Sequence, residues 1–572
     1  MTNMRTAKLC ATVCTFSFAA MVLGAHETRQ LFPWVHGFAF ISAMALVVGA
    51  FFGRLSAVSS TVLATGIGVA LRIFIFEWPA SMIGMDPDKY AVGVIRIIQT
   101  GSLVELKQAF SAHGILSAFH LLNSQVALVS GFDGRNVLVA IPILIGIVFP
   151  LTAVALTSHH TRSPIAIGLS GTIAAIATIG VLFGYWPIVQ TIAVLLWCPV
   201  IIGLSRFFSA DDGRDFVMIS VLVLATAFAH KLSMFILTGA IGAALTIRYV
   251  RIDALLGHQP IMDDGEIQTR RPWIVWLLLV LGLGIQWMIL TIFVRTVIIA
   301  KAIPLLTGGF EIAPSGGEAL AAVPANPGIV GILERRGDFL VLLPITAIAS
   351  FVLWIQERTW SMCLLLGATL ISALIVGISV VGVGIASPQR AILFGIPIFA
   401  AVLGIAAKRI VDLQSTPQLL AICLVVLIVV GAQAGSAMLA PNYPDEPRKY
   451  LTSEEVTAKT FTLDHSPEPV AMDFYYADEQ VDLDDPSATQ KTGRGHKTPG
   501  AIELNTELLN ATLINKSYSN ILLRDAGNMI LGGGRYRLTW DPIRVFSNHD
   551  RYNRVFDNGP VVGFDNNTES ST

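Results

Sequence analysis

The chain has 572 residues, of which 54% are hydrophobic and only 13% are charged, and its mean hydropathy is +0.67. Soluble domains carry about 25% charged residues, so this composition excludes a water-soluble enzyme as well as a disordered or fibrous chain. The formal net charge is −1. The chain therefore lacks an overall basic field that would attract nucleic acid, and we expect no nucleic-acid partner.

Apolar segments of about 20 residues, the length that crosses a bilayer as a helix, recur along residues 1–440. They predict an all-α polytopic membrane domain with about thirteen transmembrane helices. All five cysteines fall within these spans and form no CxxC pair, so we expect neither a disulfide framework nor a zinc site. The predicted spans are 7–25, 33–52, 57–78, 135–157, 165–184, 187–205, 216–230, 232–248, 273–297, 338–356, 360–382, 390–407 and 418–440.

One further apolar stretch, residues 113–131, has a different pattern. Small and polar residues recur there at spacings of three and four, with Leu, Phe and Val on the opposite face. Such a helix suits the membrane interface better than the hydrocarbon core. We therefore expect a long first outside loop, 79–134, that contains an interfacial helix at 113–131. The stripe consists of Ser117, His120, Asn123, Ser124, Ala127 and Ser130.

Lysine and arginine in short loops predict the orientation, because cytoplasmic loops are enriched in both. The loop 248–271 is basic, and Arg162, Arg206 and Arg409 mark further loops on the same side. Alternation from these loops predicts a multi-pass protein of the cell membrane with a cytoplasmic N-terminus. The same alternation places residues 441–572 outside.

The charge balance changes near Pro441. Of the 39 acidic and 38 basic residues, 20 and 13 lie from Pro441 onward, which leaves 19 and 25 before it. Short β-like runs at 469–476, 520–523 and 552–564, the last with an Asp-Asn-Gly turn, interrupt this polar region. They predict a small exterior α+β domain over 441–572.

Two acidic residues follow the third span closely, Asp86 and Asp88. Pro87 can begin a helix and Asp86 suits its N-cap, so one interpretation is a helix cap in a solvated turn. The other is a carboxylate at the membrane surface that acts as a general base toward an alcohol. Proximity to lipid would raise its pKa toward that task.

Five further polar residues map to the outer membrane edge: His120, Gln190, His230, Lys231 and Arg390. Ionisable residues in or beside spans usually face a cavity or a partner. The lysine can bind a phosphate as a point charge, and the arginine can bind one through two hydrogen bonds. The alternatives are ordinary interfacial residues, a lysine that extends to the headgroups and an arginine that anchors its helix. A base, a cation and an amphipathic groove at one edge would suit a lipid-linked donor.

Short polar segments of the chain resemble integral-membrane glycosyltransferases of the C superfamily, which include protein mannosyltransferases and archaeal oligosaccharyltransferase-like proteins. The similar segments lie within 57–440, with a weaker likeness in the tail. They are an early span with Arg72, the Gly84-Met85-Asp86 segment, residues 95–103, the 227–233 break, the 387–390 segment and the tail run 552–564.

The resemblance implies a polyprenyl- or dolichyl-phosphate sugar donor, membrane lipids around it, and a protein or glycan acceptor. It assigns the base to Asp86, with Asp88 as the alternate, and phosphate binding to Lys231 and Arg390. All of these must then converge in one pocket. Only Trp540-Asp541-Pro542 stands where oligosaccharyltransferases carry Trp-Trp-Asp, which argues against oligosaccharide transfer to asparagine.

Several alternatives stay open at this stage. The Asp86-Pro87-Asp88 segment matches only in part the pair of acidic residues that binds a divalent metal in some members of the superfamily. No cofactor is therefore certain, and binding of a divalent metal is left as an alternative. A transporter or flippase of lipid-linked glycans would show internal repeats and broken helices near the midplane. An inactive membrane scaffold of the same fold is the third reading, because fold alone does not establish activity.

Overall fold

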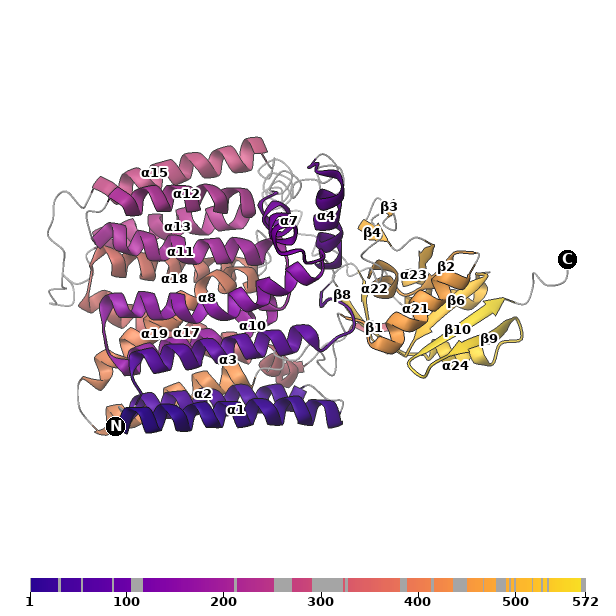
Figure 1. The fold of residues 1–572 in the computed structure, drawn as a ribbon, viewed down its shortest axis with the longest axis horizontal. Helices are drawn as coiled ribbons and strands as arrows, with labels where there is room; N and C mark the ends of the chain where they lie inside the picture. Colours follow the sequence, from indigo (N-terminus) through magenta and orange to yellow (C-terminus); the bar gives the residue numbers. More distant parts are fainter. Residues whose placement is uncertain are drawn as a thin grey trace.

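The computed structural model describes most of the chain (Figure 1). The described residues are 2–28, 32–52, 55–84, 87–103, 117–209, 213–250, 270–290, 322–324, 328–380, 388–412, 416–435, 450–466, 468–479, 490–492, 495–497, 500–516, 518–525, 528–531 and 534–566.

Long helices lie side by side in one bundle and form the first part of the molecule (Figure 1). Their buried apolar side chains make one continuous core. Each predicted span contains a helix. The bundle helices are α1 (Thr2–Thr28), α2 (Phe32–Phe51), α3 (Ala57–Glu77), α8 (Asn136–His160), α9 (Pro164–Ile176), α10 (Thr178–Gly184), α11 (Val189–Ser209), α12 (Gly213–Ala229), α13 (Lys231–Tyr249), α15 (Arg270–Gly284) with a π-helical turn at Ile285–Leu290, α17 (Gly328–Gln356), α18 (Trp360–Val380), α19 (Pro388–Val411) and α20 (Thr416–Ala434).

The chain is a mostly helical multi-pass membrane protein. Among the described residues, ten helices are long and apolar enough to cross a membrane, or eleven if the bent pair α9 and α10 counts as one span. The predicted number was about thirteen. The difference arises because α12 has only 17 residues and because the apolar helix found within α20 covers only Ile422–Ala434.

A sharp bend of 47° separates α9 from α10. The backbone of Ala177 has φ −52° and ψ 117°, which ends the first helix. Two side chains from other spans then bond the polar groups at the bend. Arg72 of α3 donates to the Ala175 carbonyl (3.0 Å), and Gln433 of α20 accepts from the Thr178 N–H (3.1 Å). These side-chain hydrogen bonds stabilise the break, because they satisfy backbone groups that would be costly to leave unpaired in lipid.

Two shorter helices, α4 (Pro87–Thr100) and α7 (Ala118–Ser130), lie at one end of the bundle, and α4 runs across the ends of the long helices (Figure 1). We call this the domain-side end, because the C-terminal domain lies beyond it, and the opposite end the distal end. The predicted interfacial helix at 113–131 thus corresponds to α7 over its described part.

A mixed α/β domain follows from Tyr450, in agreement with the predicted sheet-containing tail. Its five-stranded sheet has the order β5-β2-β6-β10-β9, with β2 parallel to β5 and β6 and the other pairs antiparallel. The elements are α21 (Ser453–His465), β2 (Val470–Met472), α22 (Phe474–Asp478), β3 (Gln490–Thr492), β4 (Gly495–Lys497), β5 (Ala501–Glu503), α23 (Asn505–Leu509), a 3₁₀ turn at Leu513–Asn515, β6 (Asn520–Arg524), β7 (Asn528–Leu531), β8 (Gly534–Leu538), α24 (Pro542–Ser547), β9 (Tyr552–Asp557) and β10 (Val561–Asn566).

A strand from between the spans joins this domain. The short strand β1 (Ala322–Pro324), which precedes α17, pairs antiparallel with β8, and β8 pairs with β7. The bundle and the C-terminal domain are therefore connected by backbone hydrogen bonds in addition to chain continuity.

Candidate active site at the domain-side end

The predicted acidic pair lies where α3 gives way to α4. Asp86 is outside the described residues and directly precedes Pro87, the first residue of α4. Asp88 lies in the first turn of α4, where its charge is favourable to the helix dipole. Its side chain is only 1% exposed. The solvated turn that one interpretation predicted is thus wrong for Asp88.

Asp88 is buried because the C-terminal domain covers the segment before α4 and the start of α4. The Leu451 N–H donates to Ser81 Oγ (2.8 Å), and the Tyr475 hydroxyl donates to the Gly84 carbonyl (3.4 Å). Lys89 Nζ and Asp478 Oδ2 form an ion pair of 2.6 Å. The candidate base region is therefore part of an interface between the bundle and the C-terminal domain.

The electrostatics at this interface are unusual. Burial, with Asp88 as the next contribution, raises the pKa of Glu479 well above its ordinary value. Burial lowers the pKa of Lys459 to about 8, although Glu479 and Asp88 act to raise it. Perturbed groups of this kind concentrate at functional sites, but structural ion networks produce them as well.

His120 lies on α7, and the middle of the predicted polar stripe faces the protein, whereas Ser117 precedes the helix and Ser130 is exposed. His120, Asn123 and Ser124 are buried, whereas Val129 on the opposite face is 90% exposed. The His120 ring lies 5.6 Å from the ring of Tyr90, and Ser124 Oγ donates to the Val94 carbonyl (3.3 Å), so the stripe packs on α4. The apolar face points outward, as suits a helix in contact with lipid.

The two predicted phosphate-binding cations lie at the starts of two helices that pack on each other. Lys231 is the first residue of α13 and Arg390 lies in the first turn of α19, and the charge of Arg390 acts on the Lys231 ammonium. Arg390 is exposed and Lys231 is partly buried. Two like charges held together at a membrane edge repel each other, so an anion between them would be bound favourably.

His230 and Gln190 have different surroundings. His230 is the N-cap of α13, and its Nδ1 accepts a hydrogen bond from the Leu232 N–H (3.2 Å), which is a structural role. Gln190 lies in the first turn of α11 and is 2% exposed. Among the described residues its side-chain amide has no hydrogen-bond partner. A buried amide without a partner is costly, so Gln190 is the better candidate of the two for a ligand contact.

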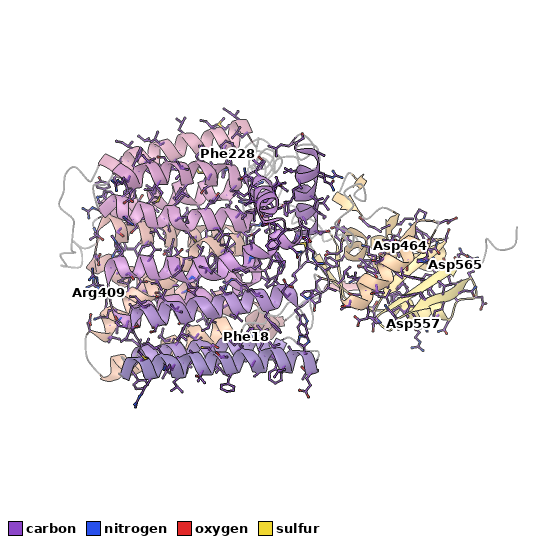
Figure 2. The ribbon with its side chains drawn as sticks, in the orientation of Figure 1. Phe18, Phe228, Arg409, Asp464, Asp557 and Asp565 are labelled. Atoms are coloured by element: carbon purple, nitrogen blue, oxygen red, sulfur yellow. The ribbon has the colours of Figure 1, made fainter. Side chains whose placement is uncertain are left out.

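The elements that carry these residues follow one another around the domain-side end. Helix α4 packs on α7, α7 packs on α12, and His230 joins α12 to α13, which in turn packs on α18 and α19. Figure 2 shows Phe228, near the end of α12, at this end and Arg409 of α19 at the other. The structure thus places the Asp88 helix and the cation pair at the same end of the bundle.

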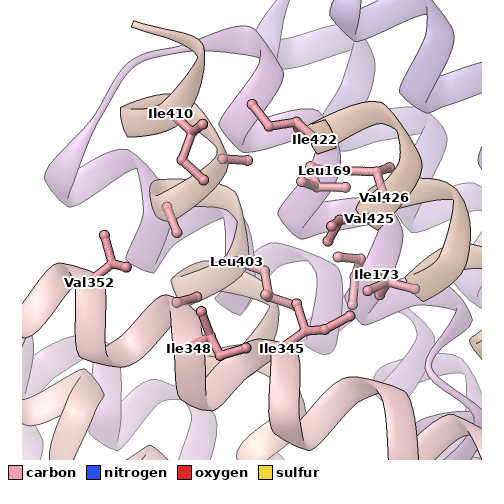
Figure 3. Close-up of a pocket in the computed structure, with 14 residues that line it drawn as sticks. Leu169, Ile173, Ile345, Ile348, Val352, Leu403, Ile410, Ile422, Val425 and Val426 are labelled. Carbon is pink, nitrogen blue, oxygen red and sulfur yellow. The ribbon is translucent and has the colours of Figure 1, made fainter. Parts of the chain in front are cut away.

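An apolar groove between α9, α17, α19 and α20 is not part of this site (Figure 3). Its α19 residues run from Leu403 to Ile410, 13 to 20 positions beyond Arg390, which is about 20–30 Å along a helix. All of its lining side chains are apolar, so it can hold hydrocarbon but offers no group for a phosphate or sugar.

Sequence reasoning missed the residues that the C-terminal domain contributes, namely Lys459, Tyr475 and Glu479. They are separated from Asp88 by more than 370 positions in the sequence, and no local pattern distinguishes them from surface charges. Among the described residues, no group of three His, Cys, Asp or Glu side chains is placed to hold a metal ion.

No protein-family model matches the chain, and no curated protein sequence matches it. Solved structures are similar. The apo oligosaccharyltransferase of Archaeoglobus fulgidus has 12% identity and a TM-score of 0.49, with 83% of this chain and 70% of that chain covered. Apo ArnT from Cupriavidus metallidurans has 10% identity and a TM-score of 0.38, with 88% and 97% covered. The same protein bound to undecaprenyl phosphate has 10% identity and a TM-score of 0.34, with 90% and 98% covered.

The mycobacterial arabinofuranosyltransferase AftD is a further similar structure, with 14% identity and a TM-score of 0.41. The match covers 88% of this chain but only 41% of that much longer one. All of these similar structures have identities of 10–14% and TM-scores below 0.5.

Proposed function

We propose that this chain is a membrane glycosyltransferase that moves a sugar from a polyprenyl-phosphate donor to a protein or glycan acceptor at the outer face of the cell membrane. The observation that carries the proposal is the cation pair Lys231 and Arg390, which lies at the same end of the bundle as α4. A phosphate on a lipid must be bound at the membrane edge. The carboxylate that takes the proton of the acceptor hydroxyl must lie at that same edge. The donor class is the one that the resemblance of the polar segments implies.

Asp86 is the proposed base, with Asp88 as the alternate. The carboxylate takes the proton of the acceptor hydroxyl while the hydroxyl oxygen attacks the anomeric carbon of the sugar. The bond between that carbon and the phosphate oxygen breaks, and the lipid phosphate leaves with the bonding electrons. Because Asp88 is only 1% exposed, Asp86 stays the first choice for this role.

Lys231 and Arg390 stabilise the negative charge on the departing phosphate, which grows as the bond breaks. Gln190 is proposed to contact the donor through its amide. His120, on α7, and His230, directly before Lys231, are both proposed to lie beside the donor.

The proposed topology has thirteen spans, in which α12 and α20 also cross the membrane. The N-terminus is cytoplasmic, 79–134 forms the first outside loop, and the transmembrane domain 1–440 precedes an exterior domain, 441–572. This topology puts the domain-side end of the bundle outside, where the acceptor is met.

Replacement of the exposed cation tests the proposal directly. We expect Arg390→Ala to raise the KM for a polyprenyl-phosphate sugar about 10- to 100-fold, because a hydrogen bond to a charged group contributes about 1.5–3 kcal/mol. Arg162→Ala, which removes an exposed arginine at the distal end, is the matched control and should leave the KM unchanged. An equal donor KM in both variants would contradict the phosphate role.

A further inference from the structure

The break between α12 and α13 carries Lys231, one of the two proposed phosphate-binding cations. His230 has an extended backbone (φ −158°, ψ 137°), so α12 ends at Ala229 and a new helix starts at Lys231. The last carbonyl groups of a helix lack partners within that helix. Unpaired carbonyls are costly beside lipid, so other groups must bond them if the break is to persist.

Part of this pairing comes from the residues of the break itself. The Thr226 carbonyl accepts from the His230 N–H (3.3 Å) and from Ser233 Oγ (3.2 Å), and the His230 carbonyl accepts from the Ser233 N–H (3.3 Å). These bonds join the end of α12 to the first turn of α13. They do not involve the carbonyls of Ala227 and Lys231.

The π-helical turn that follows α15 bonds these two carbonyls. Gln286 Nε2 donates to the Ala227 carbonyl, and Trp287 Nε1 donates to the Lys231 carbonyl (3.1 Å). The Trp287 ring also stacks on the Phe235 ring, with the ring centroids 5.1 Å apart and the planes at 23°. One turn is thus attached to both sides of the break.

Both donors are buried inside the bundle. Gln286 is 1% exposed and Trp287 is 8% exposed, and their helix packs on α13 (Figure 1). The turn at Ile285–Leu290 is π-helical, and such turns are rare and frequently lie at functional sites. A buried glutamine is costly unless it is hydrogen-bonded. Its bond to Ala227 therefore fixes the position of the break in a way that an apolar residue would not.

We propose that Gln286 and Trp287 are positioning residues for Lys231, which hold the break between α12 and α13 so that the lysine ammonium stays where the donor phosphate binds. This role rests on the proposed transferase function, and neither residue needs to touch the substrate. A lysine side chain is long and flexible. The position of its ammonium therefore depends on a fixed backbone at its root, and the π-helical turn supplies that restraint from a different helix.

Two conservative variants remove the hydrogen bonds and keep most of the packing. Trp287→Phe keeps a ring that can stack on Phe235 but lacks the N–H donor. Gln286→Met keeps the length of the side chain but cannot donate. Trp273→Phe is the matched control, because Trp273 lies on α15, is 42% exposed and contacts Tyr249, the last residue of α13.

Binding of undecaprenyl phosphate to the full-length protein in nanodiscs measures the phosphate site without any sugar transfer. We expect Trp287→Phe and Gln286→Met each to weaken binding about 2- to 10-fold, the scale of one hydrogen bond, and Trp273→Phe to leave it unchanged. In a Lys231→Met background, Trp287→Phe should have no further effect, because its action passes through the lysine. A loss of packing that acts elsewhere would persist in that background.

Sugar transfer under the same conditions separates the positioning role from the proposed function. The value of kcat/KM for the polyprenyl-phosphate sugar should fall by at least the same factor as binding, with no further fall in the Lys231→Met background. Equal lipid-phosphate affinity in the wild type and both variants would overturn the positioning role. So would a Trp287→Phe effect of equal size with and without Lys231. A protein that transfers no sugar but shows the predicted coupling to Lys231 in lipid-phosphate binding would contradict only the transferase function.

Discussion

Arg72 shows how one buried cation constrains its neighbours. It is fully buried in α3, where Nη1 donates to the carbonyls of Gly68 (2.8 Å) and Ala175 (3.0 Å) and the guanidinium lies 5.9 Å from the ring centre of Phe149. The carbonyl end of α9 supplies partial negative charge at the bend. These contacts accommodate Arg72 inside the bundle, although no ion pair with a carboxylate is found for it among the described residues.

The space around this guanidinium requires a glycine. A Cβ atom at Gly184 would lie 2.7 Å from Arg72 Nε, which no ordinary contact allows. We expect Gly184→Ala to destabilise the protein by about 1–3 kcal/mol, the usual cost of overpacking. Gly66→Ala, where nothing lies within 4 Å, is the matched control. Thermal unfolding in detergent, followed by tryptophan fluorescence, should separate the two variants, and equal midpoints would contradict this account of Arg72.

At the scale of elements, a polar network holds the distal ends of α8, α18 and α19 together. Glu357, in the turn between α17 and α18, contacts His160 Nδ1 (3.2 Å) and Arg409 Nη2 (2.9 Å), and Ser361 contacts His160 Nε2 (3.1 Å). Although burial acts to raise it, the pKa of Glu357 is lowered by hydrogen bonding and charge from His160, Thr359 and Arg409. A lowered pKa contributes stability above the ordinary value, and this contribution is lost as the pH falls below it.

Glu357→Gln tests the network. We expect a loss of about 1–3 kcal/mol at pH 7, since charged hydrogen bonds are removed, and this difference from the wild type should shrink as the pH falls below about 4.5. Glu468→Gln, at an exposed position, serves as the control. Unfolding curves of both variants at pH 7 and pH 4 provide the measurement, and a deficit of the Glu357 variant that persists unchanged at pH 4 would be inconsistent with an ionised Glu357.

The elements could be predicted where the signal is local. An apolar run such as 136–160 specifies a span by itself, and the stripe on α7 identified a helix with one polar face. The burial of the segment around Asp88 could not be predicted, because Tyr475, which donates to the Gly84 carbonyl, lies 391 positions away in the sequence. The strand β1 was missed for the same reason: three residues acquire strand geometry only through pairing with β8.

At the scale of the whole molecule, hydrogen bonds join the bundle and the C-terminal domain. The domain pairs with β1, bonds Ser81 and Gly84, and buries Asp88. Figure 2 shows Arg409 at the distal end, away from the domain. Arg206 lies in the last turn of α11 and Arg162 follows α8, and both of these helix ends contact the same region, around Glu357 and Ser361. This asymmetry predicts that the C-terminal domain lies outside the cell.

Single-cysteine labelling in intact cells tests this orientation. In a variant with its five native cysteines replaced by alanine, we expect a cysteine at Asp525 to react with a membrane-impermeant maleimide. A cysteine at Arg162, exposed at the distal end, should react only after the membrane is permeabilised. The reverse pattern would contradict the predicted topology and would move the candidate site to the cytoplasmic face.

Sugar transfer by purified protein in nanodiscs, measured with a panel of polyprenyl-phosphate sugars, tests the central claim most directly. The wild type is expected to release lipid phosphate from at least one donor in the presence of an acceptor. Asp86→Asn should lower that rate about 10²- to 10⁴-fold, as expected for loss of a general base, while the exposed control Asp525→Asn keeps it. Full activity in Asp86→Asn and in Asp88→Asn, or no transfer from any donor, would contradict the assignment.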